Sequence, residues 1–238
     1  MDETTAHPQR EEGDATRGNG VCGLFISFEG GDGAGKTTQA RKLASWLEER
    51  GHDVRWVHEP GGTELGEGVR SLLLESSADA VGARAELLLY EAARAQLVEE
   101  VVEPALRCGA IVVTDRFSDS TTAYQGYGRG IDSADVRRFN AFATRGLAPD
   151  VTVLLMLDAT AGMQRVGARQ GSADRMERAG AGFHRRVQEG FARIAEAEAQ
   201  RVRVVDASGT RDEVFERVRG AVGGALARYE AARGGALS

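Results

Sequence analysis

Long hydrophobic runs are missing from this chain of 238 residues. The longest largely apolar stretch, Val151 to Leu157, is far shorter than the roughly 20 residues that a membrane-spanning helix needs. The first residues are acidic and polar, without the apolar segment of a secretion signal. We therefore expect neither a membrane protein nor a secreted one.

Cysteine and histidine are scarce as well. Cys22 and Cys108 are too few for a disulfide framework, and the four scattered histidines show no zinc-binding spacing with them. These absences favour a cytosolic location with reduced thiols.

Lysine is limited to Lys36 and Lys42, so nearly all other fixed positive charge is arginine. The net charge of -6 argues against broad, nonspecific binding of nucleic acid, which needs a basic face. A local anion site is still compatible with this balance. Arginine suits such a site because its planar guanidinium grips phosphate through two parallel hydrogen bonds.

Apolar segments of strand length alternate with amphipathic segments of helix length. This alternation is typical of an α/β fold, and the nearly continuous apolar strands indicate a parallel sheet covered on both faces. We predict a three-layer, doubly wound sheet of five parallel strands in a single domain over residues 21–233. Residues 1–20 are expected to be a disordered extension, and 234–238 a short tail.

The boundaries of these elements follow from the same pattern. The predicted strands are Leu24–Phe28, Val54–His58, Ala110–Thr114, Val151–Leu157 and Val202–Val205. The predicted helices are Thr37–Arg50, Thr63–Glu75, Gly82–Arg107, Ser118–Tyr124, Ser133–Arg145, Thr160–Arg169, Phe183–Gln200 and Arg211–Arg233.

A glycine-rich loop follows the first strand and matches the phosphate-binding pattern G-x-x-x-x-G-K-[S/T] at every fixed position. Its residues are Gly30, Gly31, Asp32, Gly33, Ala34, Gly35, Lys36 and Thr37, followed by Thr38. The glycines let backbone N–H groups approach phosphate oxygens, and the next helix points its positive end at the same place. We expect Lys36 to reach the outer phosphates and Thr37 to offer its hydroxyl to Mg²⁺. A nucleoside triphosphate site is predicted here.

Several classes of nucleotide-binding protein are excluded. GTPases read their base with Asn-Lys-x-Asp, which this chain lacks, and the catalytic signatures of protein kinases are absent. The classes that are not excluded are small-molecule kinases and proteins that couple ATP hydrolysis to work on a partner or polymer. The chain shows no additional domain of the kind that the second class uses.

The third predicted strand delivers Asp115 and Arg116 to the carboxyl edge of the sheet, where doubly wound folds bind ligands. Asp115 is placed to hold Mg²⁺, directly or through water, and Arg116 to grip a phosphate. After the second strand, the segment from Glu59 to Thr63 opens a helix on which Arg70 borders the apolar stripe.

The helix that follows can be read in two ways. Its spacing places Arg94 on an apolar face with Leu87, Tyr90 and Leu97, where a nucleobase carbonyl could serve as its partner. An offset stripe that begins at Leu88 has the same spacing and would leave Arg94 in solvent. Periodicity does not decide between the two.

Taken together, these segments resemble thymidylate kinases in family order, over about Gly23 to Tyr229. The matching stretches are Phe28 to Thr38, Glu59 to Thr63, Ala92 to Arg94, Asp115 to Phe117 with Ser120, Ala123 to Gly126, Asp174 to Glu177, and Phe183 to Val187. The resemblance implies the P-loop fold of nucleoside monophosphate kinases and transfer of the γ-phosphoryl group of ATP, bound with Mg²⁺, to dTMP. It also implies a homodimer.

The resemblance further implies a role for individual residues. Asp32 contacts the sugar hydroxyl of the acceptor, and Arg70 and Arg116 clamp its phosphate. Tyr90 stacks on thymine and Arg94 reads the base. The remaining positions of the acceptor side match Glu59, Ser120, Thr121, Tyr124 and Gln125.

Gly33 stands where some members of the family carry an extra arginine inside the P-loop. The segment from about 164 to 182 is therefore expected to be a mobile lid that supplies the missing cation. It contains Arg165, Arg169, Arg175 and Arg178, of which Arg169 and Arg175 are the catalytic candidates. The alternatives are a kinase for another nucleoside monophosphate, or a nucleotide-binding regulator without catalysis.

Overall fold

The computed structural model describes residues 23–75, 81–167 and 174–234, and its centre is one sheet of five parallel strands. The strand order is β2-β3-β1-β4-β5, so β1 lies in the middle and the chain crosses over from one side of it to the other. The strands are β1 (Leu24–Glu29), β2 (Val54–His58), β3 (Ile111–Asp115), β4 (Val151–Met156) and β5 (Val202–Asp206). The predicted five-stranded parallel sheet is confirmed, with strand boundaries within one or two residues.

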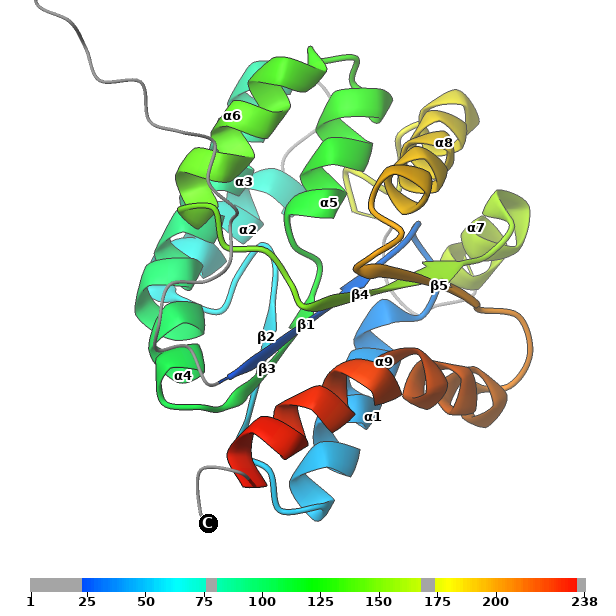
Figure 1. The fold of residues 1–238 in the computed structure, drawn as a ribbon. Coiled ribbons are helices and arrows are strands. Elements are labelled where there is room, and N and C mark those ends of the chain that lie inside the picture. The colour runs from blue at the N-terminus through cyan, green and yellow to red at the C-terminus, as the bar shows by residue number, and fades with distance from the viewer. Residues whose placement is uncertain (1–22, 76–80, 168–173, 235–238) are drawn as a thin grey trace, which may run out of the picture.

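Helices cover both faces of the sheet (Figure 1). They are α1 (Lys36–Glu49), α2 (Glu64–Glu75), α3 (Ala83–Leu97), α4 (Glu103–Arg107), α5 (Ser118–Thr121), α6 (Ser133–Thr144), α7 (Ala159–Gly167), α8 (Ala181–Ala197) and α9 (Arg211–Gly234). In the described part of the chain, none of the helices has the length and hydrophobicity that a membrane span requires.

The core has a layer on each side of the sheet because strand residues alternate in direction. Ile26 and Val113 face α1 and α9, where they pack with Leu43 and Val218. Phe25, on the other side of β1, packs with residues of α3 and α4. Both faces of the central strands are thus buried, which explains why their sequences read as nearly continuous apolar runs.

Two predicted helices are interrupted by wider π turns. The predicted helix 82–107 contains a π segment, η1 (Val98–Val102), between α3 and α4. Pro104, at the start of α4, has no N–H to donate and its ring crowds the preceding turn, so a wider turn relieves both problems. A second π segment, η2 (Thr122–Gly128), extends α5 beyond its predicted end at Tyr124. This longer helix brings Tyr124 and Gln125 to the carboxyl edge of the sheet.

Candidate active site

The glycine-rich loop turns between β1 and α1 at the carboxyl edge of the sheet. Gly30 has a φ of 136°, and a Cβ at this position would lie 2.3 Å from the carbonyl oxygen of Leu155. Any side chain would therefore collide with β4. The backbone needs glycine at this position so that the chain can leave β1 and form the loop that leads into α1. The first N–H groups of α1 are free to bind a ligand in the loop.

Lys36 is the cation of this loop and is buried. Its Nζ donates a 2.8 Å hydrogen bond to the carbonyl oxygen of Gly31. Desolvation by burial lowers the pKa of Lys36 to about 8, and the nearby positive charge of Arg116 lowers it further in the same direction. A phosphate bound in the loop would favour the charged form of this lysine.

Thr37 and Asp115 meet beside the loop. The hydroxyl of Thr37 donates to Oδ2 of Asp115, and Oδ1 of Asp115 is buried without a hydrogen-bond partner. A hydroxyl and a carboxylate with a spare oxygen form the kind of oxygen donor set that Mg²⁺ prefers. These two residues therefore fit the magnesium ion that the sequence motif implies.

Arg116 connects the glycine-rich loop to the rest of the edge. Its Nη2 donates to Oδ1 of Asp32 at 2.6 Å, its Nη1 donates to Oγ of Ser120 at 3.1 Å, and its guanidinium stacks over the ring of Tyr124. Burial works against ionisation of Asp32, yet the charges of Arg116 and Lys36 outweigh it and lower the pKa of this carboxyl. Asp32 and Arg116 are thus a charged pair.

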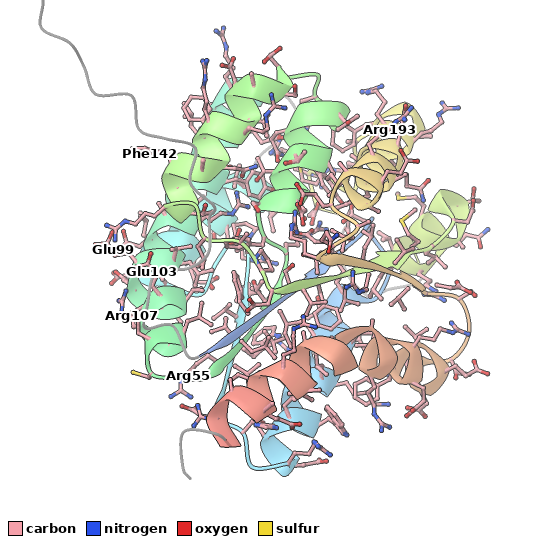
Figure 2. The ribbon with its side chains drawn as sticks, viewed as in Figure 1. Arg55, Glu99, Glu103, Arg107, Phe142 and Arg193 are labelled. Carbon is pink, nitrogen blue, oxygen red and sulfur yellow. The ribbon has the colours of Figure 1, made fainter. Side chains whose placement is uncertain are left out.

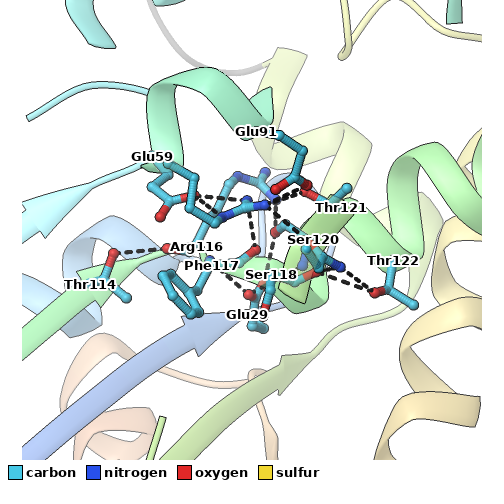
Figure 3. Close-up of polar contacts among 12 residues, drawn as sticks. Glu29, Glu59, Glu91, Thr114, Arg116, Phe117, Ser118, Ser120, Thr121 and Thr122 are labelled. Carbon is cyan, nitrogen blue, oxygen red and sulfur yellow. Dashed lines mark hydrogen bonds and ion pairs between the residues drawn. The ribbon is translucent and has the colours of Figure 1, made fainter. Parts of the chain in front are cut away.

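The backbone at Arg116 is held by a buried carboxylate on β1. Arg116 has a φ of 74°, a conformation that costs a non-glycine residue free energy. Glu29 accepts hydrogen bonds from the backbone N–H of Phe117 and Ser120 and, at 2.6 Å, from the hydroxyl of Ser120 (Figure 3). Glu29 thereby fixes the turn that aims Arg116 at the glycine-rich loop.

Arg94 is buried rather than solvated, with an exposed fraction of 1%. It donates hydrogen bonds to Glu59 and Glu91 at 2.8 Å, and also to Thr121. Figure 3 labels these three acceptors. Leu88, which begins the competing stripe, is half exposed. The apolar face of α3 is therefore the one that includes Arg94, and the two carboxylates stabilise its charge.

Most of these groups line one cleft with a volume of about 810 Å³, whereas Glu29 and Glu91 are not part of its lining. Lys36, Asp115 and Arg116 lie between its two ends. At one end Arg70, Tyr90, Arg94 and Gln125 come together from α2, α3 and η2, and at the other Arg165 of α7 faces the loop between β5 and α9.

Comparisons with known proteins identify the family of this chain. The family model described as thymidylate kinase matches residues 28–218. A thymidylate kinase of Gloeobacter violaceus is 50% identical over 200 residues, which cover 84% of this chain and 94% of the relative. One from Cutibacterium acnes is 48% identical, covering 87% of this chain and 99% of the relative. The chain belongs to the thymidylate kinase family.

A solved structure of the same family has the same fold. The crystal structure of thymidylate kinase from Ehrlichia chaffeensis superimposes with a TM-score of 0.69 at 33% identity. The match covers 82% of this chain and 96% of the other. The nucleoside monophosphate kinase fold expected from the sequence is therefore confirmed.

Most residues predicted for a thymidylate kinase site lie together in the cleft. Gly30 and Gly31 come immediately before the first lining residue in the sequence. The residues that line it are Asp32, Gly33, Ala34, Gly35, Lys36, Thr37, Thr38, Glu59, Arg70, Tyr90, Arg94, Asp115, Arg116, Ser120, Thr121, Tyr124 and Gln125.

The predicted lid arginines are not all brought to the cleft. Arg169 lies outside the described residues. Arg175 is buried away from the cleft, where it forms a 2.6 Å ion pair with Glu86 and donates to the carbonyl oxygen of Leu73. These contacts do not support its predicted role at the transferring phosphate. Arg165 does line the cleft and donates to the carbonyl oxygen of Ala207 at 3.3 Å.

The sequence did not point to Glu29, Glu86 and Arg129. These residues lie outside the lining of the cleft and support residues that line it. One signal could have found Glu86, because Glu86, Tyr90 and Arg94 are spaced four residues apart and therefore share a face of α3. Nothing in the sequence points to Arg129, whose partner is 43 positions away.

The depressed pKa of Lys36 predicts a pH dependence of nucleotide binding. In the free protein Lys36 loses its proton as the pH rises through about 8, so above that pH ADP must bind together with a proton. We expect the Kd for ADP in the presence of Mg²⁺ to rise by up to about tenfold per pH unit above 8, measured by isothermal titration calorimetry.

The matched control is Lys36→Arg, which keeps its charge throughout this range. Burial also raises the pKa of Glu29 to about 8, and this control retains Glu29 unchanged. A Kd that is constant from pH 7 to 9.5 in the wild type, or an equal rise in the Lys36→Arg variant, would contradict the assignment to Lys36.

Proposed function

We propose that this chain phosphorylates dTMP to dTDP, with ATP as the donor and Mg²⁺ bound with it, as a step in the supply of dTTP. The observation that best supports this function is that the glycine-rich loop and a second set of anion-binding arginines line the same cleft. An enzyme that transfers a phosphoryl group between two nucleotides needs this arrangement, since both polyanions must be held in line at close range.

The donor is assigned to the glycine-rich loop. Its N–H groups and Lys36 bind the outer phosphates of ATP, and the loop from Ala207 to Arg211 forms the wall at the distal end of the cleft. Thr37 and Asp115 hold Mg²⁺, which when bound neutralises charge on the phosphates. The spare oxygen of Asp115 supports this assignment.

The acceptor is assigned to the opposite end of the cleft. Arg70 and Arg116 bind the phosphate of dTMP, and Tyr90 stacks on the base. Arg94 donates to a base carbonyl in exchange for one of its present acceptors, such as Thr121. Oδ2 of Asp32 is buried and accepts no hydrogen bond, which supports its role as the partner of a sugar hydroxyl. Glu59, Ser120, Thr121, Tyr124 and Gln125 complete the walls of this subsite.

The phosphate-binding cations are paired with protein oxygens before any ligand arrives. Lys36 donates to Gly31, Arg70 donates to the carbonyl oxygen of Pro60 at 3.0 Å, and Arg116 donates to Asp32. Incoming phosphate oxygens exchange with these acceptors, so the cations need not be stripped of water at that moment. Preorganised charge of this kind is the main resource of phosphoryl-transfer enzymes.

Arg165 is the lid arginine that we assign to the donor phosphates. The backbone of α7 packs directly on the glycine-rich loop, because a Cβ on Gly33 would lie 2.1 Å from the carbonyl oxygen of Gly162. An arginine at position 33 would collide with α7. Arg165, one turn further along α7, provides a cation on the same side of the cleft.

The substrate assignment is tested by turnover. We expect the purified protein to release ADP in a coupled assay when dTMP is added, and to use dTMP better than dGMP or AMP, because the acceptor subsite combines an aromatic stack with an arginine donor. Preference for another monophosphate would favour a different kinase of the same fold. ADP binding without turnover of any monophosphate would favour the alternative of a nucleotide-binding regulator without catalysis.

Removal of Arg165 tests the lid assignment. We expect Arg165→Ala to lower kcat by at least about a hundredfold, since a cation at the transferring phosphate contributes that much or more in related chemistry. Arg193→Ala is the control: this arginine is exposed on α8, pairs with Glu196, and is not part of the cleft (Figure 2). Turnover within twofold of the wild type in Arg165→Ala, with an unchanged melting temperature, would reject the role.

A homodimer is also proposed, formed through α2, α3 and α6. These helices pack side by side, α3 between the other two, on one side of the molecule (Figure 1). Their outer faces expose large apolar side chains, which monomeric proteins usually keep scattered. These side chains are Leu65, Leu72, Leu88, Phe139 and Phe142.

The dimer is tested at Phe142, which is 84% exposed and projects from α6 (Figure 2). We expect the wild type to have twice the chain mass by light scattering and Phe142→Glu to shift toward the monomer, because a charge at an apolar interface is costly to desolvate. Val204→Glu, on the edge strand β5, is an exposed apolar control that should leave the mass unchanged. A monomeric wild type would disprove the proposal, as would a Phe142→Glu variant that is still a dimer.

A further inference from the structure

Glu86 on α3 is the most densely hydrogen-bonded carboxylate behind the acceptor end of the cleft, and its side chain has no exposed surface. Oε1 accepts from Nε2 of Gln125 at 2.8 Å and from Nε of Arg129 at 3.1 Å. Oε2 accepts from Nη2 of Arg129 at 3.0 Å and from Nη1 of Arg175 at 2.6 Å. Three side chains from two other segments thus converge on one carboxylate.

The charges around Glu86 keep it ionised. Burial alone would raise the pKa of Glu86, but the hydrogen bonds from Arg129 and Gln125 and the charges of the two arginines lower it. An ionised carboxylate can only accept hydrogen bonds. Every group that faces Glu86 must therefore turn a donor toward it.

Glu86 cannot easily swing away from this position. Arg175, which pairs with it, also donates to the carbonyl oxygen of Leu73 at 2.7 Å, so this part of the predicted lid segment is anchored to the end of α2. The guanidinium of Arg129 stacks on the ring of Phe183 from α8. The carboxylate is held from α2, η2 and α8 as well as by its own helix.

This arrangement decides which end of the Gln125 amide faces the cleft. A glutamine amide has a donor end and an acceptor end that are nearly equal in shape. Because Nε2 of Gln125 is turned toward Glu86, the oxygen is the end of the amide that is left for the cleft that Gln125 lines. Glu86 thereby makes this part of the wall a hydrogen-bond acceptor.

The acceptor character matters for the base of the bound monophosphate. Thymine presents an N3–H donor beside its carbonyl oxygens, whereas cytosine has an unprotonated N3 and an amino group in place of one carbonyl. An amide oxygen from Gln125 complements the N3–H of thymine and opposes the bare N3 of cytosine. A mismatch leaves two acceptors face to face in a buried place, which is more costly than a merely absent contact.

We propose that Glu86 is a positioning residue that selects the pyrimidine base of the acceptor: by holding Gln125 with its amide oxygen toward the cleft, it favours a base with N3–H over cytosine. This inference rests on the proposed function, since it takes a pyrimidine monophosphate as the acceptor. It assigns a purpose to a buried carboxylate that is not itself part of the cleft lining.

The variant Glu86→Gln should reverse the orientation of Gln125. The oxygen of the new amide is drawn to the Oε2 side, where Arg129 and Arg175 each point a charged donor. Its NH₂ group then occupies the Oε1 side, where it displaces the Nε–H of Arg129 and faces Gln125, which must offer its oxygen in return. Gln125 would turn its own NH₂ group toward the cleft, where it suits the N3 of cytosine.

The measurement is the pair of dissociation constants for dTMP and dCMP, obtained by isothermal titration calorimetry on the wild type and on Glu86→Gln. We expect the preference for dTMP over dCMP to fall at least tenfold, with dCMP binding more tightly to the variant than to the wild type. Tighter binding of dCMP is a result that general loss of structure cannot produce. Equal weakening of both ligands, or an unchanged preference, would overturn the proposal.

A double-mutant cycle tests whether Glu86 acts on the base preference through Gln125. In a Gln125→Ala background, Glu86→Gln should no longer change the preference, because the amide through which it acts is gone. A change that persists in this background would overturn the role of Gln125. If Glu86→Gln does not accumulate as folded protein, Glu86→Asp keeps the charge but retracts the carboxylate from Gln125. It should also lower the preference for dTMP, and an unchanged preference would count against the proposal.

Failure of this inference differs from failure of the proposed function. Turnover of dTMP by the wild type tests the function by itself. An active wild type whose preference does not respond to Glu86 rejects only the positioning role, whereas a wild type that binds neither dTMP nor dCMP rejects both.

Discussion

The ion pair between Arg116 and Asp32 joins the two halves of the cleft, and the rest of the site is arranged around it. Asp32 belongs to the glycine-rich loop after β1, and Arg116 directly follows β3. Two polyanions can approach one another only if positive charge lies between them, and that charge must be stable while the cleft is empty. The protein meets both demands by pairing each cation with an oxygen of its own, which a phosphate oxygen can replace.

Behind the cleft, buried carboxylates hold these side chains in place. Glu29 fixes the turn at Arg116, Glu59 and Glu91 hold Arg94, and Glu86 holds Gln125. A buried carboxylate is costly unless it is hydrogen-bonded. Glu29 and Glu86 accept hydrogen bonds at both oxygens, whereas Glu59 and Glu91 each accept at one oxygen and keep the other buried without a partner. Burying these carboxylates costs desolvation free energy, but their hydrogen bonds fix the positions of the cleft side chains. A site for in-line transfer needs its groups to be placed to within about half an ångström.

Much of the site could be predicted because its residues lie within short segments. The glycine-rich loop has its chemistry within eight consecutive positions, and Asp115 and Arg116 end a strand whose edge is predictable from the α/β pattern. Periodicity was insufficient for Arg94, because two faces of α3 have the same spacing and only packing chooses between them. The lid arginines were harder still, since position in a charged loop says nothing about which partner each guanidinium finds.

By itself the sequence determined the fold class, the phosphate-binding loop and the family, because these depend on local spacing and on hydrophobic periodicity along the chain. Only the tertiary structure decided that Arg165 lines the cleft while Arg175 is buried against Glu86, and that the Gln125 amide turns its Nε2 toward Glu86. The physical reason is that charges and hydrogen bonds act through space. Their partners here are up to 102 positions apart in the chain, and no local pattern records such distances.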